Sequence, residues 1–174
     1  MSIMIAINAD RINSLDLSPV RTVIEEWLAS GAIAQNEQQL QFEIEYPREE
    51  SDPREISELP EVRLWFIRLD SCYPWLPFLL DWKVGELTRY AAMLVPHQFH
   101  RTQGIQYNPE ALEMFLMSKI FVLTDWLNQQ KIPSKSKLMA MSQMFGYDLD
   151  DAFFDVIVPH TAIGDRTSNQ PSPN

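Results

Sequence analysis

Residues 40–46 read LQFEIEY and residues 2–8 read SIMIAIN, and these two short stretches decide the fold class. In residues 40–46, apolar and polar side chains alternate, as in a strand with one buried face. Residues 2–8 form a short run rich in β-branched isoleucine, which is typical of a buried strand. A helical pattern lies between the two stretches. They therefore form either a parallel pair joined by a helical crossover or an antiparallel pair, and the sequence leaves both open.

The helix between these stretches is marked at both ends. Ser18 and Pro19 supply a hydroxyl N-cap followed by proline at the first helical position. Apolar residues then recur every three or four positions over residues 20–28, and Gly31 stands where a left-handed helix stop is favoured. We therefore predict a helix from Ser18 to Gly31.

A mostly helical body follows. Asp52 and Pro53 repeat the cap-and-proline pattern and predict a short helix that ends before Pro60. Residues 61–73 fit a helical stripe and a strand face alike, although their length and spacing favour the helix. The remaining patterns predict at most two turns over residues 75–82, helices over 84–94, 109–127, 134–145 and 148–158, and a loop over 96–107.

These patterns together predict an α+β fold. A small two-strand element, at about residues 2–8 and 40–46, is expected to join a mostly helical body of five to seven helices. We expect residues 1–158 to form one globular domain, since a chain of this length can bury a sizeable core. Residues 159–174 are polar, contain proline and lack periodicity, so they are expected to form a disordered tail.

Charge excludes some classes of partner. The 174 residues include 14 basic and 24 acidic ones, which gives a net charge of −10. Residues 1–60 alone carry four basic and twelve acidic side chains. Such a charge repels phosphate backbones, which argues against a nucleic-acid-binding protein. The longest apolar runs reach about six residues, against the ~20 that a bilayer requires, so we expect no stable membrane insertion.

Cysteine usage and the first residues indicate a reducing compartment. The single cysteine, Cys72, excludes an internal disulfide and any multi-cysteine metal site. The opening residues, MSIMIAINADRIN, have neither the basic and apolar regions of a signal peptide nor the composition of a transit peptide. We therefore expect a cytoplasmic protein.

Three residues are candidates for catalysis or metal binding. His97 and His100 form an H-x-x-H pair, which could chelate a metal on a helix, but Pro96 disfavours helical geometry there. Cys72 could act as a nucleophile with one of these histidines as its base, although no nucleophile motif surrounds it. The sequence also lacks a glycine-rich phosphate loop. We expect no catalytic, cofactor-binding or metal-binding residues, and the alternative is a small thiol enzyme or hydrolase that uses Cys72 with His97 or His100.

Two groups of residues are candidates for binding a protein partner. Glu49, Glu50 and Glu55 belong to an acidic run that is expected to be solvated and able to steer a basic partner. Trp75 and Trp82 lie in an aromatic stretch interrupted by prolines, and amphipathic rings on rigid turns are good interface anchors. Packing in the core is the other interpretation of these rings.

Four long segments carry a resemblance to a known family. They are IEYPREESDPREISELPEVRLWFIRLD at 44–70, YPWLPFLLDWKVGELTRYAAMLVPHQF at 73–99, GIQYNPEAL at 104–112 and FGYDLDDAFFDVI at 145–157. They resemble the chlororespiratory-reduction-6-type family of cyanobacteria and chloroplasts, and the likeness extends over about residues 15–157. The likeness rests on long sequence segments and not on a catalytic signature.

The resemblance implies a non-catalytic assembly factor, or chaperone, for the photosynthetic NAD(P)H dehydrogenase-like (NDH) complex. It implies that the protein binds NdhI, the ferredoxin-like iron–sulfur subunit, during assembly and does not remain in the finished complex. It supplies no functional residues. Plant relatives would carry a transit peptide and act in the stroma, so the lack of such a peptide in this sequence leads us to expect a cyanobacterial cytosolic protein.

Overall fold

The computed structural model describes residues 1–157, so the expected tail at 159–174 lies outside the described residues. The chain divides into two compact units, the first covering residues 1–133 and the second beginning at Ser134. The expectation of one globular domain over residues 1–158 stays a prediction.

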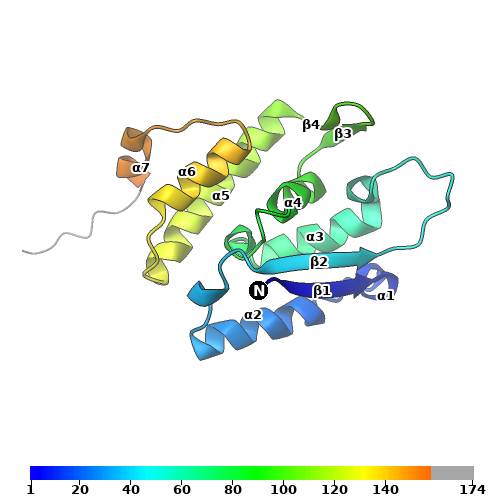
Figure 1. The fold of residues 1–174 in the computed structure, drawn as a ribbon, viewed down its shortest axis with the longest axis horizontal. Helices are drawn as coiled ribbons and strands as arrows, with labels where there is room; N and C mark the ends of the chain where they lie inside the picture. The colour runs from blue at the N-terminus through cyan, green and yellow to red at the C-terminus, as the bar shows by residue number, and fades with distance from the viewer. Residues whose placement is uncertain (158–174) are drawn as a thin grey trace, which may run out of the picture. The chain divides into compact units, whose positions relative to one another are not determined.

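A two-stranded parallel sheet forms the N-terminal part of the first unit (Figure 1). β1 (Ile3–Asn8) and β2 (Leu40–Glu45) pair from Ile3 opposite Leu40 to Asn8 opposite Glu45. The crossover between the strands contains α1 (Ala9–Asn13), α2 (Ser18–Ser30) and the 3₁₀ turn η1 (Ala34–Asn36). The predicted two-strand element is confirmed, and the parallel crossover is the correct arrangement of the two left open.

One face of this sheet builds the core of the first unit. Ile5, Ile7 and Phe42 are buried, as the alternating pattern predicts. The ring of Phe42 makes edge contacts with Trp65 and Phe66, at centroid distances of 6.0 and 5.6 Å. Both of these rings project from α3 (Pro60–Cys72), which therefore packs on the buried face of the sheet.

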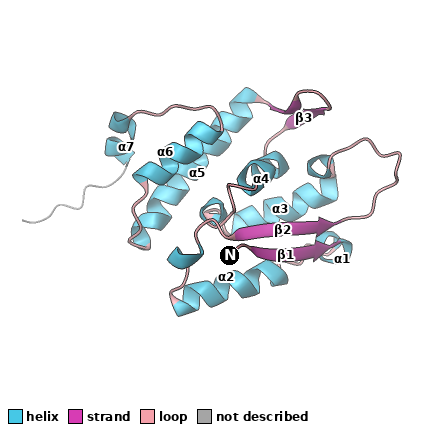
Figure 2. Cartoon of the chain, viewed as in Figure 1, coloured by secondary structure: helices cyan, strands magenta, loops and turns pink. Residues whose placement is uncertain are grey.

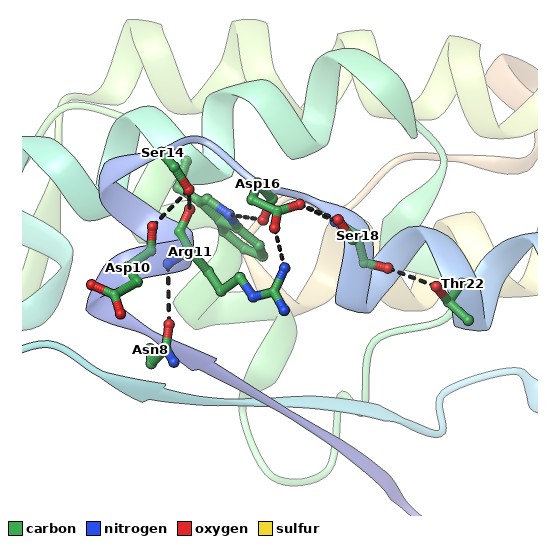
Figure 3. Close-up of polar contacts among 8 residues, drawn as sticks. Asn8, Asp10, Arg11, Ser14, Asp16, Ser18 and Thr22 are labelled. Atoms are coloured by element: carbon green, nitrogen blue, oxygen red, sulfur yellow. Dashed lines mark hydrogen bonds and ion pairs between the residues drawn. The ribbon is translucent and has the colours of Figure 1, made fainter.

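Helix α2 begins and ends as predicted, but its N-cap position is Leu17, whose side chain makes no capping hydrogen bond, and not Ser18. Ser18 is the first helical residue, and its backbone N–H donates to the Asp16 carboxylate at 2.8 Å (Figure 3). Hydrogen bonds from Ser18, helped by Arg11, lower the pKa of Asp16 to about 2. The Trp65 indole N–H donates to the Asp16 carbonyl at 3.0 Å, so the same residue ties this turn to α3.

The helix predicted to start at Asp52 and end before Pro60 is wrong. The chain instead forms a loop followed by one 3₁₀ turn, η2 (Ile56–Glu58), and α3 begins at Pro60. The Asp52 carboxylate binds the guanidinium of Arg54 two residues later, so it closes a local turn rather than a helix. Proline at the first helical position explains why Pro60 starts α3.

The next segments confirm helix over residues 61–73, which the sequence favoured without deciding. The single 3₁₀ turn η3 (Leu76–Phe78) falls within the predicted limit of two turns, and α4 (Glu86–Leu94) follows. Helices dominate this part of the first unit (Figure 2).

The loop predicted over residues 96–107 is wrong, because these residues contain a β-hairpin. β3 (His97–His100) pairs antiparallel with β4 (Gly104–Tyr107), with His97 opposite Tyr107. Gly104 has a φ of 72°, which lets the short connection turn back on itself.

The first unit ends with α5 (Pro109–Gln129), which is capped as predicted. The Asn108 side chain accepts the Ala111 N–H at 3.0 Å. The buried side chains Leu116, Ile120 and Leu123 recur along the helix at the expected spacing.

The second unit contains α6 (Lys135–Met144) and α7 (Asp151–Ile157). The Lys135 ammonium lies 3.1 Å from the Asp151 carboxylate and 3.2 Å from that of Asp155. The described residues therefore contain seven α-helices and two small sheets, and the predicted α+β class with five to seven helices is confirmed.

Candidate partner-binding surface

The acidic candidates lie in the loop that follows β2. Glu49 and Glu50 are exposed, and neither makes an ion pair within residues 1–157. Glu55 is half-buried and forms a capping box with Glu58 at the start of η2, where the Glu58 carboxylate accepts the Glu55 N–H at 2.7 Å. Glu49 and Glu50 therefore present free charge, whereas Glu55 also holds backbone structure.

The rest of this loop is ordered by its own charged residues. Arg54 binds the Asp52 carboxylate through two nitrogens, and Arg48 donates to the Arg54 carbonyl. Hydrogen bonds from Arg54 lower the pKa of Asp52 to about 2. The negative charge of Asp52 is thus neutralised by Arg54 within the same loop.

Trp75 belongs to a cluster of aromatic rings. Its indole stacks on Trp126 of α5 with a centroid distance of 4.2 Å and an interplanar angle of 8°. Tyr73 contacts the edge of Trp75 at 5.7 Å, and Phe78 lies 5.3 Å from Trp126. Trp75 is half-buried, so one part of the ring is packed while another part stays accessible.

Trp82 is also half-buried, and its polar edge is occupied. Its indole N–H donates to the Pro77 carbonyl at 2.8 Å. The ring therefore braces the turn between η3 and α4 and leaves only part of its surface for a partner.

The structure does not bring the acidic and aromatic candidates together. The segment after η3 meets the beginning of β2, where Leu80 pairs with Leu40. The acidic loop leaves the other end of β2, after Glu45. At about 3.3 Å per residue, the six residues of β2 place the points where these two segments meet the strand roughly 16–20 Å apart. A partner that used both would have to span the length of the sheet.

Sequence reasoning missed a third exposed surface, the outer face of the sheet. Met4, Ala6 and Asn8 of β1 are exposed, and the register places Ala6 opposite Glu43 and Asn8 opposite Glu45. Neither glutamate makes an ion pair within the described residues. The alternation in residues 40–46 marked Glu43 and Glu45 as solvent-facing, but their juxtaposition with β1 depends on the parallel register, which the sequence left open.

Asp81 is a buried carboxylate at the beginning of the sheet. It accepts hydrogen bonds from the Ser2 hydroxyl at 2.9 Å, the Gln41 amide at 3.1 Å and the Lys83 backbone N–H at 3.0 Å. Burial acts to raise the pKa of Asp81, but these hydrogen bonds, with one from Val84, outweigh it and lower that pKa. A carboxylate so fully bonded is structural, since its oxygens are engaged by the protein itself.

Two charged side chains of α4 close the outer edge of β2. The Glu86 carboxylate accepts the Phe42 N–H at 3.3 Å, and the Arg89 guanidinium donates to the Phe42 carbonyl at 3.0 Å. Burial raises the pKa of Glu86, although Arg89 opposes this. The pair replaces the hydrogen bonds that a third strand would have made.

A partly buried ion pair joins α3, α4 and α5. The Lys119 ammonium binds the Asp70 carboxylate and donates to the Pro74 carbonyl at 3.0 Å. The Tyr90 hydroxyl donates to the same carboxylate at 2.6 Å. Burial, reinforced by Asp70, raises the pKa of Tyr90 well above its ordinary value, so the phenol stays a donor.

The two histidines point to opposite sides of their strand, and His97 lies far from Cys72. His97 and His100 lie three apart on strand β3, where successive side chains alternate between faces, so the two rings point to opposite sides. His97 contacts the Ser57 hydroxyl and the Val95 carbonyl, each at 3.0 Å. Ser57 precedes α3, while Cys72 ends that 13-residue helix, about 18 Å away at ~1.5 Å per residue.

Within residues 1–157, histidine, cysteine and acidic side chains nowhere gather in threes at metal-binding distances. None of the helices in that range combines the length and apolar character that a bilayer crossing requires.

The fold and this surface define a small α+β protein with a two-stranded parallel sheet, whose outer face and adjoining loop carry unpaired carboxylates. The chain belongs to the chlororespiratory reduction 6 (Crr6) family, whose model matches residues 7–156. This match confirms the resemblance seen in the sequence. The family is associated with assembly of the NDH complex. No solved structure matches the chain.

Proposed function

We propose that the protein is a non-catalytic assembly factor that binds NdhI, the ferredoxin-like iron–sulfur subunit, while the photosynthetic NDH complex is being assembled. The observation that carries this proposal is the family match over residues 7–156. The protein would act in the cytosol of a cyanobacterium and release its client before the complex is complete.

The exposed carboxylates support the binding role. Glu49 and Glu50 are free to attract a locally basic surface of the client, because no cation of the described residues neutralises them. Their attraction would be screened over ~8–10 Å at ordinary salt, so it would mainly accelerate association. Trp75 and Trp82 are the proposed short-range contacts, since partly exposed indole rings contribute strongly where they become buried.

The proposal is tested by capturing purified NdhI on the immobilised protein at low and high salt. The acidic variant carries Glu49→Gln, Glu50→Gln and Glu55→Gln, in which glutamine keeps the oxygen that caps η2 at position 55. We expect slower association of NdhI with this variant and a weaker dependence of association on salt. Trp75→Ala or Trp82→Ala should instead accelerate dissociation.

A matched control removes the same number of charges elsewhere. The control variant carries glutamine in place of Glu25, Glu26 and Glu113, which are exposed residues on helices α2 and α5. It therefore has the same net charge as the acidic variant. This control should associate with NdhI faster than the acidic variant does. Absence of capture by the wild-type protein at any salt concentration would reject NdhI as the client. Capture that responds to neither set of substitutions would keep the client and reject this surface.

A further inference from the structure

The outer edge of β1 has unpaired backbone groups. The Ile3 N–H donates to the Gln39 carbonyl at 2.6 Å, and the parallel register continues to Asn8. In this register the N–H and C=O groups of odd-numbered β1 residues face β2, so those of Met4 and Ala6 point away from it. Among residues 1–157, no group hydrogen-bonds to the backbone of Met4 or Ala6.

The opposite edge of the sheet is closed, which shows that the open edge is specific to β1. On β2, the Leu40 N–H donates to the Leu79 carbonyl at 2.8 Å, and the Leu40 carbonyl accepts the Asp81 N–H at 2.9 Å. Glu86 and Arg89 then bind the backbone of Phe42. Exposed strand edges are templates for another strand, and proteins usually cover or charge them. The side chains at the β1 edge are uncharged methionine and alanine.

The face beside this edge is open as well. Parallel sheets are usually covered on both faces, yet Met4 is 58% exposed and Ala6 is exposed too. Glu43, opposite Ala6, and Glu45 carry free negative charge on the same face. A strand added beside β1 would lie about two strand spacings, roughly 10 Å, from β2. The small Ala6 side chain leaves a path for a long basic side chain from that strand toward Glu43.

We propose that the outer edge of β1 is a strand-addition site for an extended, basic segment of a partner protein. The segment's backbone pairs with Met4 and Ala6, and a lysine or arginine of the segment extends over Ala6 toward Glu43. Backbone pairing supplies affinity in this mode of recognition, and side chains on the added strand supply specificity. A second copy of this chain is a poorer occupant, because edge-to-edge pairing would bring two acidic sheet faces together.

This inference deepens the proposed function, since the client is the expected source of the segment. Two probes are used, so that failure of the strand-addition site can be told apart from failure of NdhI as the client. One is purified NdhI, and the other is the synthetic peptide acetyl-KVKVKVK-amide, with acetyl-EVEVEVE-amide as its charge-reversed control. Binding is measured by amide exchange and by chemical-shift changes of the full chain at Met4 and Ala6.

The deciding variant is Ala6→Pro. Proline is tolerated on an edge strand where its missing N–H would have faced solvent, as the Ala6 N–H does here. The substitution therefore leaves the β1–β2 pairing in place while removing one donor and obstructing an incoming strand. Ala6→Val is the matched control, since it retains the donor and a high strand propensity. Circular dichroism and thermal unfolding verify that both variants are folded.

We expect the lysine peptide, and not the glutamate peptide, to slow amide exchange at Met4 and Ala6 in the wild-type protein. Ala6→Pro should weaken binding of the peptide and of NdhI by about tenfold or more, and Ala6→Val by no more than about twofold. Glu43→Gln should weaken both interactions and lower their salt dependence.

The contrary results separate the strand-addition site from the identity of the client. Peptide binding at the β1 edge without NdhI binding would keep the strand-addition site and reject the client. NdhI binding that is equal in Ala6→Pro and Ala6→Val, with no protection of β1, would keep the client and overturn the strand-addition site. Absence of protection by either probe would also overturn it. A dimer lost in Ala6→Pro would reassign this edge to self-association and overturn the partner proposal.

Discussion

The indole of Trp75 lies flat on the indole of Trp126, 4.2 Å away and within 8° of parallel. This stacking couples η3 to α5, because Trp126 projects from α5 and is only 8% exposed. A ring expected to meet a partner thus also stabilises the fold. Any binding defect of a Trp75 variant must be compared with its stability.

The first prediction concerns the contribution of Trp75 to the stability of the fold. Trp75→Ala should lower the free energy of unfolding by about 1–3 kcal/mol, because both apolar burial and ring stacking are lost. Trp75→Phe retains a ring over Trp126 and should lose less than half as much. Urea unfolding followed by circular dichroism measures both values. An unchanged midpoint for Trp75→Ala would show that the stacking contributes nothing to stability.

The second prediction concerns the buried ammonium of Lys119, a residue that is 3% exposed. Lys119→Ala should cost about 2–4 kcal/mol, since it leaves the Asp70 carboxylate without its cation and opens a cavity. The loss is limited because the Asp70 side chain is 26% exposed and can gain water. Lys83→Ala, at an exposed position, is the control and should change stability by less than about 0.5 kcal/mol. Equal midpoints for the two variants would contradict this role.

The third prediction is a pH dependence that arises from Asp81. Its pKa is lowered in the folded protein, so its stabilising contribution is present above the unfolded pKa, near 3.8, and is lost as pH falls through the folded pKa. Asp81→Asn should cost about 1–3 kcal/mol at pH 7. The difference between wild type and Asp81→Asn should shrink as pH falls below about 3.8.

Urea unfolding at a series of pH values measures that difference. The exposed Asp125→Asn variant is the control and should track the wild type throughout. A difference that stays constant with pH would mean that the Asp81 charge is not what stabilises this site.

The fourth prediction compares two apolar residues on α5. Leu123 is 2% exposed and Phe121 is 50% exposed. Leu123→Ala should cost about 2–5 kcal/mol through lost burial and a residual cavity, whereas Phe121→Ala should cost less than about 1 kcal/mol. Thermal and urea unfolding give both values. A larger loss at Phe121 than at Leu123 would show that the exposed face of α5 is covered in solution.

The helices were predictable where a cap and an apolar period agree. Asn108 followed by Pro109 marked the start of α5, and the spacing of its apolar residues marked its buried face. The same cap-and-proline pattern at Asp52 led to a wrong prediction of a helix. The residues after it lack an apolar period, and the Asp52 carboxylate binds the Arg54 guanidinium instead of capping a helix. A capping residue thus predicts a helix only when apolar residues at helical spacing follow it in the sequence.

The hairpin at residues 97–107 was missed for a different reason. Its strands have four residues each, and its turn has no Asn-Gly or Asp-Gly pair. Gly104, followed by an alternation of Ile105 and Tyr107 with polar residues, was the available signal. The candidate surface was predictable only as a list of exposed acids and rings, because the parallel register and the bond between Ser2 and Asp81 arise from long-range contacts.

The hydrogen bond from Ser2 to Asp81 has a consequence for biosynthesis. Its two residues are 79 positions apart, so the ribosome makes β1 long before it makes the carboxylate that anchors the strand's beginning. At ~5–20 residues per second, the nascent β1 waits at least several seconds for Asp81. During that interval β1 lacks the hydrogen bond between Ser2 and Asp81 that fixes its beginning. Chaperone contacts with the emerging chain are therefore expected to concentrate on its first eight residues.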